Sequence, residues 1–190
     1  MKRTKKVLLA SLFGCLFLCL GGSATNSYAT TNLTVTDFAG LQSAFTTANA
    51  NTAEDYVVTI NGTIQATAPL TLTSAKMTLT GTGTILGYGD GTISYEDLIK
   101  ASKNASLTID GIEISGHKSG SALGADESTI YVKNGKITNN KGYVGGGIEI
   151  KHRSTIYIWR RDIKQYIRLP KRRHWCYGIN RLSIWRRHIW

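Results

Sequence analysis

A short segment of alternating apolar and polar residues occurs twice, 26 residues apart, and this repeat restricts what the chain can fold into. Ser128-Thr-Ile-Tyr-Val132 returns as Ser154-Thr-Ile-Tyr-Ile158. Alternation with a period of two is typical of a β-strand with one buried face. A strand-and-turn unit of this length cannot bury its apolar face alone, but stacked copies can. The repeat therefore predicts a solenoid in which each strand pairs in parallel with its counterpart one repeat later.

Earlier strands align with a more variable spacing. Leu79-Thr-Gly81 matches Ile109-Asp-Gly111 at a shift of 30, and Gly111 matches Gly135 at a shift of 24. Gly and Asn separate the alternating runs, where corners need positive φ. The sequence therefore predicts an all-β fold, a parallel β-helix with about four coils over residues 56–158. A β-sandwich or an antiparallel barrel is the alternative, because short strands separated by turns also build those folds. The further runs that we expect to be strands are 57–60, 70–73, 77–80, 107–109 and 112–114.

A helix is expected before most of the strands, over residues 37–50. Thr36 or Asp37 can accept hydrogen bonds from the free N–H groups of its first turn. Thr46, Thr47 and Asn49 weaken the helical pattern, so we expect a short helix. Residues 30–55 are therefore assigned as an N-terminal cap, whose helix covers the sheet edge and the apolar core of the first coil. Apolar residues at spacings of three and four form one face of this helix: Phe38, Leu41, Phe45 and Ala48.

The N-terminus has the features of a signal peptide, which we assign to residues 1–29. A basic segment precedes the apolar stretch Val7–Leu20, and small residues follow it. Cleavage is predicted after Ala29, with Ala24 as the alternative. A membrane anchor and a lipoprotein modified at Cys15 are less favoured, because the apolar stretch is short for a membrane span and continues past that cysteine. We therefore expect a secreted or cell-surface protein with no membrane span after cleavage.

The net charge of +11 is unevenly distributed along the chain. Residues 30–152 hold 8 Lys and 11 Asp or Glu, whereas residues 153–190 hold 11 Lys or Arg and a single Asp. The body is thus close to neutral, which argues against a nucleic-acid partner for it. The three cysteines, at positions 15, 19 and 176, lie outside the body. Hydrogen-bond ladders and apolar stacking must therefore stabilise the body without disulfides.

Residues near the second copy of the repeat resemble a known family. Ile137-Thr-Asn-Asn140 followed by Gly145-Gly-Gly-Ile148 is similar to the repeats of polymorphic outer-membrane-type and related bacterial surface proteins. The leading helix, the turn region Ile85–Gly91 and the strands in residues 107–116 are similar to those of large exported β-helix proteins. The resemblance covers residues 37–158 and implies a right-handed parallel β-helix of the pectate-lyase-like superfold. It implies little about function, because this superfold includes lyases, hydrolases and adhesins.

No residues of the body are assigned a catalytic, cofactor-binding or metal-binding role. A polysaccharide lyase or hydrolase needs carboxylates that converge on one sheet. Asp110 and Glu113 are the best pair, but a turn separates them, so their side chains need not converge. Lys118 beside His117 is the only other candidate base. We interpret all of these as solvated turn residues, together with three adjacent acidic pairs whose members face opposite ways in a strand: Glu54-Asp55, Glu96-Asp97 and Asp126-Glu127.

Several motifs are interpreted as turn residues. Three matches to the N-glycosylation sequence begin at Asn32, Asn61 and Asn104. With a signal of bacterial type, these Asn and Thr residues are expected in β-turns instead. Tyr88-Gly-Asp-Gly91 is also a turn signal, because as a metal loop it lacks further ligands.

The residue alphabet changes abruptly in the tail, residues 159–190. All four Trp and nine of the ten Arg lie within residues 153–190, with one of the 20 Gly. The 26-residue period persists, because Ile158-Trp-Arg-Arg-Asp-Ile163 returns as Ile184-Trp-Arg-Arg-His-Ile189. Since a Trp codon read one base later always encodes Gly, we expect the tail to be a frameshifted reading of further repeats. Such a tail is expected to be disordered or poorly packed, and the gene to be a fragment of that of a longer surface protein.

Three functional classes are compatible with these patterns. The repetitive Thr, Gly and Asn composition favours a structural or adhesive surface protein, whose partners we expect among cell-surface glycans or host surface proteins. The alternative is the N-terminal part of a polysaccharide-degrading β-helix enzyme, which rests on the resemblance alone. A third class, a cationic tail that binds a membrane or a nucleic acid, rests on the Arg and Trp of residues 153–190. The frameshift hypothesis argues against it.

Overall fold

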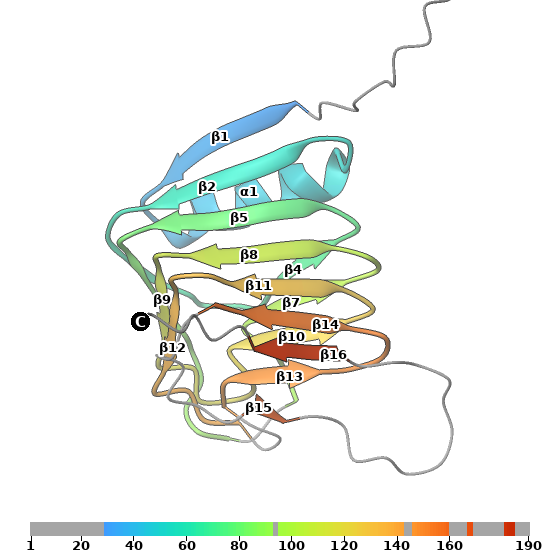
Figure 1. Cartoon of the computed structure of the whole chain (residues 1–190). Coiled ribbons are helices and arrows are strands. Elements are labelled where there is room, and N and C mark those ends of the chain that lie inside the picture. The colour runs from blue at the N-terminus through green and yellow to red at the C-terminus, as the bar shows by residue number, and fades with distance from the viewer. Residues whose placement is uncertain (1–28, 93–94, 143–145, 160–166, 169–180, 185–190) are drawn as a thin grey trace, which may run out of the picture.

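The computed structural model describes residues 29–92, 95–142, 146–159, 167–168 and 181–184, and these form many short strands and one helix (Figure 1). The fold is all-β apart from that helix, as the sequence predicts. The elements are, in chain order, β1 (Thr30–Val35), α1 (Phe38–Ala50), β2 (Asp55–Ile60), β3 (Thr63–Gln65), β4 (Leu70–Thr73), β5 (Lys76–Gly81), β6 (Thr84–Leu86), β7 (Ile99–Ser102), β8 (Ser106–Asp110), β9 (Glu113–Ser115), β10 (Leu123–Asp126), β11 (Thr129–Val132), β12 (Lys136–Thr138), β13 (Ile148–Ile150), β14 (Thr155–Ile158), β15 (Ile167–Arg168) and β16 (Arg181–Ile184).

The strands form three sheets. Sheet A has the order β1-β2-β5-β8-β11-β14-β16, sheet B the order β12-β9-β6-β3, and sheet C the order β15-β13-β10-β7-β4. Every pairing between described strands is parallel. A β-sandwich or an antiparallel barrel does not fit this pattern, because both depend on antiparallel neighbours.

From β2 onward the chain visits the sheets in a fixed cycle. β2, β3 and β4 lie in sheets A, B and C, and the next three strands repeat that order. We call one passage through the three sheets a round; four rounds lie between the start of β2 and the end of β13, and β14 follows in sheet A. Figure 1 shows the strands of sheet A lying one below another as the chain advances.

The registers test the repeats seen in the sequence. Ile130 pairs with Ile156, which confirms the shift of 26. Leu79 pairs with Ile109, which confirms the shift of 30. The shift of 24 between Gly111 and Gly135 is wrong. Ser106 pairs with Thr129 and Glu113 with Lys136, so these strands are offset by 23 residues. The two glycines do not occupy equivalent positions, because the offset of 23 places Asn134 opposite Gly111.

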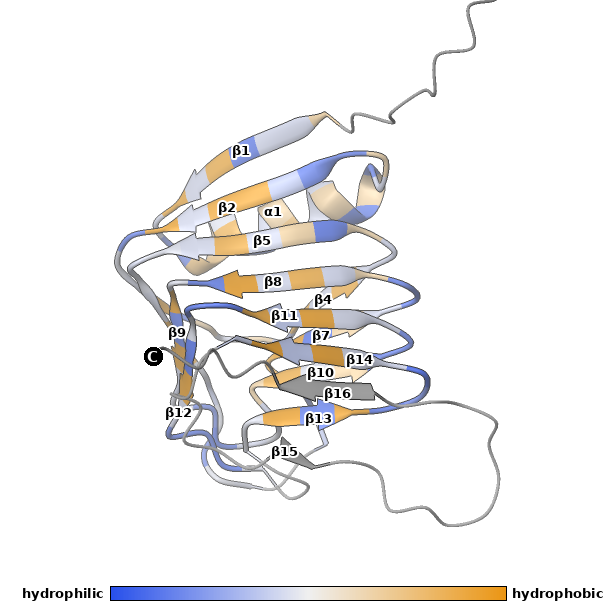
Figure 2. Ribbon diagram, viewed as in Figure 1, coloured by the Kyte–Doolittle hydropathy of each residue, from blue (hydrophilic) through white to orange (hydrophobic). Residues whose placement is uncertain are grey.

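Hydrophobic and hydrophilic residues alternate along several strands of sheet A (Figure 2), and the buried apolar side chains of the described residues form one core. In β2 and β8 the burial alternates residue by residue, as expected for strands with one face inward. Ile130 and Ile156 are both fully buried, one round apart. The packing thus places identical side chains on top of one another in consecutive rounds.

α1 follows β1 and precedes β2 in the chain, where later rounds have strands of sheets B and C between two strands of sheet A, and it packs against β4, β1 and β2. Asp37 accepts a hydrogen bond from the Gly40 N–H at 2.7 Å and so caps the helix N-terminus, as predicted. The buried face comprises Leu41, Ala44, Phe45 and Ala48. Ala44 was not among the predicted residues, and Phe38 is only half-buried against the core.

In the part of the chain that is described, the four passages from sheet C to sheet A between β4 and β14 each turn at a residue with positive φ. These residues are Ser74 (56°), Asn104 (65°), Glu127 (50°) and Arg153 (39°). The passages from sheet B to sheet C differ in length, since they comprise residues 66–69, 87–98, 116–122 and 139–147. The variable repeat length of the sequence therefore resides mainly in this one kind of connection.

Two parts of the chain lie largely outside the described residues. The signal peptide is one, because the description begins at Ala29. Most of the tail is the other. Within the tail, β15 pairs with β13, and β16 pairs with β14 at a shift of 26, with Ile158 opposite Ile184. The expectation of a disordered tail does not hold at these two strands. β16 keeps the 26-residue offset of the preceding round, whereas Ile167 of β15 pairs with Ile148 at an offset of 19.

Candidate functional site

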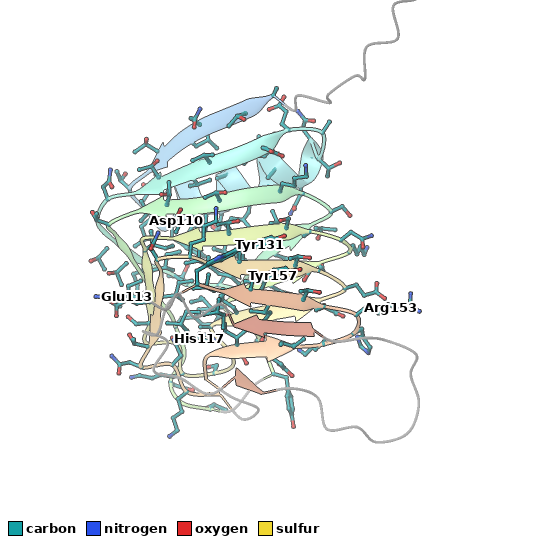
Figure 3. The ribbon with its side chains drawn as sticks, viewed as in Figure 1. Asp110, Glu113, His117, Tyr131, Arg153 and Tyr157 are labelled. Carbon is teal, nitrogen blue, oxygen red and sulfur yellow. The ribbon has the colours of Figure 1, made fainter. Side chains whose placement is uncertain are left out.

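The predicted pair Asp110 and Glu113 does not form a site. Asp110 ends β8 in sheet A and accepts a hydrogen bond from the Asn134 side chain at 2.7 Å. Glu113 begins β9 in sheet B and accepts one from the Thr138 hydroxyl at 2.7 Å. Each carboxylate therefore binds a neighbour one round later. In Figure 3 both lie at one side of the molecule, with Arg153 at the opposite side.

The adjacent pair Glu54 and Asp55 fastens the first strands together. Glu54 accepts hydrogen bonds from the Thr31 hydroxyl at 2.6 Å and from the Asn51 side chain at 2.8 Å. Asp55 forms an ion pair with Lys76 at 3.4 Å, and both side chains are more than 40 % exposed. An ion pair that exposed contributes little to stability.

The interpretation of the pair Glu96-Asp97 as solvated turn charges is wrong for Asp97. Glu96 is exposed and accepts a hydrogen bond from the Tyr88 hydroxyl at 3.0 Å. Asp97 is only 5 % exposed. It lies at the end of the long connection 87–98, and its carboxylate covers Gly124 of β10, where an added Cβ would overlap it. The signal in the sequence is the absence of a side chain at Gly124, in the next round.

Asp97 belongs to a three-residue group that we name the lysine clasp: Asp97, Glu149 and Lys151. Lys151 Nζ lies 3.5 Å from Asp97 Oδ2 and 3.1 Å from Glu149 Oε2. The side chains are 2 % exposed for Asp97, 13 % for Glu149 and 30 % for Lys151. Asp97 Oδ1 is buried and accepts no hydrogen bond from the described residues. The clasp joins the start of β7 to β13, two rounds later.

Burial decides the acid–base properties of the clasp. It raises the pKa of Asp97 to about 6, although Lys151 acts in the opposite direction, and Glu149 adds a smaller increase. Burial lowers the pKa of Lys151, but Asp97 and Glu149 outweigh it, so the pKa lies above its ordinary value. A carboxyl group whose pKa is raised to about 6 and a cationic amine are therefore held together next to a second carboxylate.

A second ionic group lies close by, around Asp126. Lys100 Nζ lies 3.1 Å from Asp126 Oδ2, and His152 Nδ1 lies 3.0 Å from Oδ1. Burial raises the pKa of Asp126, but hydrogen bonds from His152 and Lys100 and their charges outweigh it, so the pKa lies below its ordinary value. Its partner in the pair, Glu127, is exposed and turns the corner.

His117 is fully buried, which differs from its interpretation as a solvated turn residue. Its Nε2 lies 3.0 Å from the Glu96 carbonyl oxygen, and the ring packs edge-on against Tyr88 at 4.8 Å. The Asn140 side chain accepts a hydrogen bond from the His117 N–H and donates one to the Ile114 carbonyl. Asn140, the last residue of the repeat motif Ile137-Thr-Asn-Asn140, therefore holds the connection of the preceding round. Lys118 is exposed.

The turn interpretations have mixed outcomes. Asn104 lies in a turn with φ of 65°, and Asn61 lies in the short connection between β2 and β3. Asn32 is different, because it lies within strand β1. Asp90, in the Tyr88–Gly91 turn, accepts a hydrogen bond from the Thr92 N–H at 2.7 Å, as a turn residue does.

The outer face of sheet A presents three aromatic rings, which we name the aromatic strip: Tyr131, Tyr157 and Trp159. The two tyrosine rings stack at 5.0 Å with 9° between their planes. The ring centroid of Trp159 lies 5.8 Å from that of Tyr131 and 6.1 Å from that of Tyr157. Trp159 is 41 % exposed. Figure 3 shows both tyrosines on neighbouring strands. The 26-residue repeat places the tyrosines in register, so the strip follows from the sequence.

Comparisons with known proteins give no relative: no family model, no curated protein and no solved structure matches the chain. Within the described residues there is no helix of the length and apolarity that a membrane crossing requires. The same part of the chain holds no group of three or more His, Cys, Asp or Glu side chains placed to bind a metal ion.

Proposed function

We propose that the chain is a right-handed parallel β-helix, a surface protein of the kind that its repeat motif resembles. The support is the fixed cycle through sheets A, B and C, with parallel pairing of each strand to its counterpart one round later. Right-handed crossovers between parallel strands are strongly favoured by strand twist, which gives the handedness. In this reading each round is one coil, and α1 caps the first.

The proposed role of this β-helix is structural and adhesive, at the cell surface or after secretion. The aromatic strip is the observation that supports it. Aromatic side chains are enriched where proteins contact partners, since they offer a large contact area for little loss of conformational entropy. Tyr131 and Tyr157, which precede the proposed frameshifted tail, offer such an area on neighbouring strands of sheet A. Cell-surface glycans and host surface proteins are the proposed partners.

The adhesive role is tested by binding of the full chain to immobilised cell-surface glycans and to immobilised host surface proteins. We expect Tyr131→Ala to weaken binding by about tenfold, as for an aromatic anchor of the strip. Tyr95→Ala is the matched control, because Tyr95 is 67 % exposed and lies outside the strip, in connection 87–98. Equal binding by the two variants, or no retention of the unaltered chain on any surface, contradicts the proposal.

The alternative, the N-terminal part of a polysaccharide-degrading enzyme, has one observation in its favour. Asp97 and Glu149 both approach Lys151, and a carboxyl with a raised pKa beside a second carboxylate is typical of glycoside hydrolysis. The burial of Asp97 argues against access by a polymer. An assay of depolymerisation on acidic and neutral polysaccharides distinguishes the two roles; turnover that is lost in Asp97→Ala favours the enzyme.

Export and the frameshifted tail are further proposals. Strand β1 begins at Thr30, next to the proposed cleavage site after Ala29, so removal of residues 1–29 keeps the whole of β1 and takes away the hydrogen bond that the Ala29 carbonyl accepts from the Asp55 N–H. N-terminal sequencing of the exported protein should give Thr30; a membrane-bound product that keeps Met1 contradicts this. The nucleotide sequence around codon 158 tests the tail. A stop codon within the tail in the shifted frame, or a lack of Gly-rich repeats there, rules out the frameshift.

A further inference from the structure

The lysine clasp brings together an amine, a buried carboxyl group and a second carboxylate in a body without cysteine. Lys151 Nζ lies between Asp97 Oδ2 and Glu149 Oε2, at 3.5 and 3.1 Å. An ion pair of this kind usually fills its hydrogen-bonding capacity when it is buried. Here Asp97 Oδ1 accepts none from the described residues. The arrangement therefore suits a reaction at the Asp97 carboxyl better than a purely structural ion pair.

We propose that Lys151 and Asp97 condense to an intramolecular isopeptide bond, with Glu149 as the proton acceptor. This inference does not depend on the adhesive role. The product is an amide that links the start of β7 to the residue after β13 and closes the chain across two rounds. The bond would take the place of a disulfide in fastening an exported fold.

The geometry supports the attack of the amine on the carboxyl carbon. Because Nζ lies 3.5 Å from Oδ2, the amine and the carboxyl group are already in contact before the reaction, which replaces an encounter between two free groups. Gly124 leaves room for the carboxyl group against β10, since an added Cβ would overlap it. The 2 % exposure of the Asp97 side chain keeps bulk water from the product.

The raised pKa of Asp97 favours this reaction, whereas the raised pKa of Lys151 opposes it because it keeps the amine as an ammonium, so the attack requires a base. A carboxylic acid accepts a nucleophile at its carbon far more readily than a carboxylate does, and burial raises the pKa of Asp97 to about 6. The ammonium must lose a proton before it can attack. Glu149 contacts the ammonium directly and is the proper base for that step. Lys100 is the other charged group that acts on Asp97, and it favours the carboxylate form.

The reaction balances without an oxidant or a further reactant. The Nζ–Cγ bond forms, one Cγ–O bond breaks, and the oxygen leaves as water. That water takes the acid proton of Asp97 and one proton from Nζ. Of the other two protons of the ammonium, one stays on the amide nitrogen and one passes to Glu149, which later releases it to solvent.

The test is peptide mapping by mass spectrometry of the purified full chain after protease digestion. We expect one branched peptide that contains both Asp97 and Lys151, lighter by one water molecule than the two linear peptides together. Two linear peptides of full mass overturn the proposal. A water deficit on a linear peptide that contains Asp97 alone also overturns it, because that product is a cyclic imide.

Substitutions test which side chains take part in the condensation. Lys151→Arg and Asp97→Ala should abolish the branched peptide, and Glu149→Gln should slow its formation by about a hundredfold. Lys100→Arg is the matched control, because Lys100 forms a similar ion pair on the neighbouring carboxylate Asp126. It should leave the branched peptide in place. If the bond forms at an unchanged rate in Glu149→Gln, Glu149 is not the proton acceptor. If a variant fails to fold, the peptide map of the unaltered chain still shows whether the isopeptide bond exists.

Discussion

Asn49, on the last turn of α1, accepts a hydrogen bond from the Thr73 N–H at 2.7 Å and donates one to the Thr71 carbonyl at 2.8 Å. A single side-chain amide thus supplies both bonds that a neighbouring strand would make with β4, the first strand of sheet C in the order of the chain. An unpaired edge of a sheet invites pairing with other chains. The helix therefore closes this edge by hydrogen bonding as well as by packing.

Replacement of this amide should weaken the fold. Asn49→Ala leaves two backbone groups of β4 without their partner, so we expect the free energy of unfolding to fall by about 1–2 kcal/mol. Chemical denaturation followed by circular dichroism measures it. Gln42→Ala is the control, because Gln42 is exposed on the same helix. If both variants lose the same small amount, the bonds to β4 are not important for stability.

A side chain at Gly111 should destabilise the fold through both backbone strain and steric overlap. A comparison with Gly91, where only the strain applies, separates the two effects. Gly111 has φ of 95° and lies against the Gly81 carbonyl oxygen, which an added Cβ would contact. Gly91 has nearly the same φ, 97°, and open space around it. Backbone strain of about 1 kcal/mol is expected in both alanine variants. Gly111→Ala should lose more, by about a further 1–2 kcal/mol, in the same unfolding experiment.

The stacked tyrosines should stabilise the last rounds. Tyr157→Ala removes the stack on Tyr131, which is worth about 1 kcal/mol beyond the area it buries. Tyr157→Phe keeps the ring and should change the melting temperature little. Thr78→Ala, on the same row of sheet A near the other end, is the control for loss of an outward side chain. A Phe variant as unstable as the Ala variant would show that the hydroxyl group, and not the stack, is responsible.

The clasp should make stability depend on pH when the isopeptide bond cannot form. In Lys151→Arg, which cannot form the bond, the Asp97 carboxyl stays free, and burial still raises its pKa above the unfolded value of 3.8. A raised pKa means that the protonated form favours the folded state. The free energy of unfolding should therefore be highest below about pH 4 and decline as the pH rises through about 6, by up to about 3 kcal/mol. Asp97→Asn in the same background should remove this decline; a decline that persists assigns it to another group.

The parallel rounds could be predicted from the sequence because they depend on patterns within short segments of the chain. The alternation of apolar residues sets the inward face of each strand, and the copies 128–132 and 154–158 share one register. The offset of 23 between β8 and β11 was missed because Gly occurs at several corners, so a glycine match does not define a register.

The clasp was missed for a different reason. Burial of Asp97 depends on the length of connection 87–98 and on Gly124, which lies in the next round. Its ion pair depends on Lys151, one round further along the chain. No window of sequence contains all three, and an acidic residue beside a turn is usually solvated. Asn49 was similarly judged by its helix propensity, whereas its use lies in a sheet that the local pattern does not show.

The connections from sheet B to sheet C have a consequence for evolution and for engineering. They range from residues 66–69 to residues 87–98 while the flanking strands keep parallel register, so the architecture has already absorbed insertions at this point. Insertions in surface loops cost little loop entropy. New peptide segments are therefore best grafted at the exposed residues Gly89 and Asp90 of connection 87–98, away from buried Asp97, for display of an epitope or a binding loop. The opposite corners, each fixed by a residue with positive φ, are the places to leave untouched.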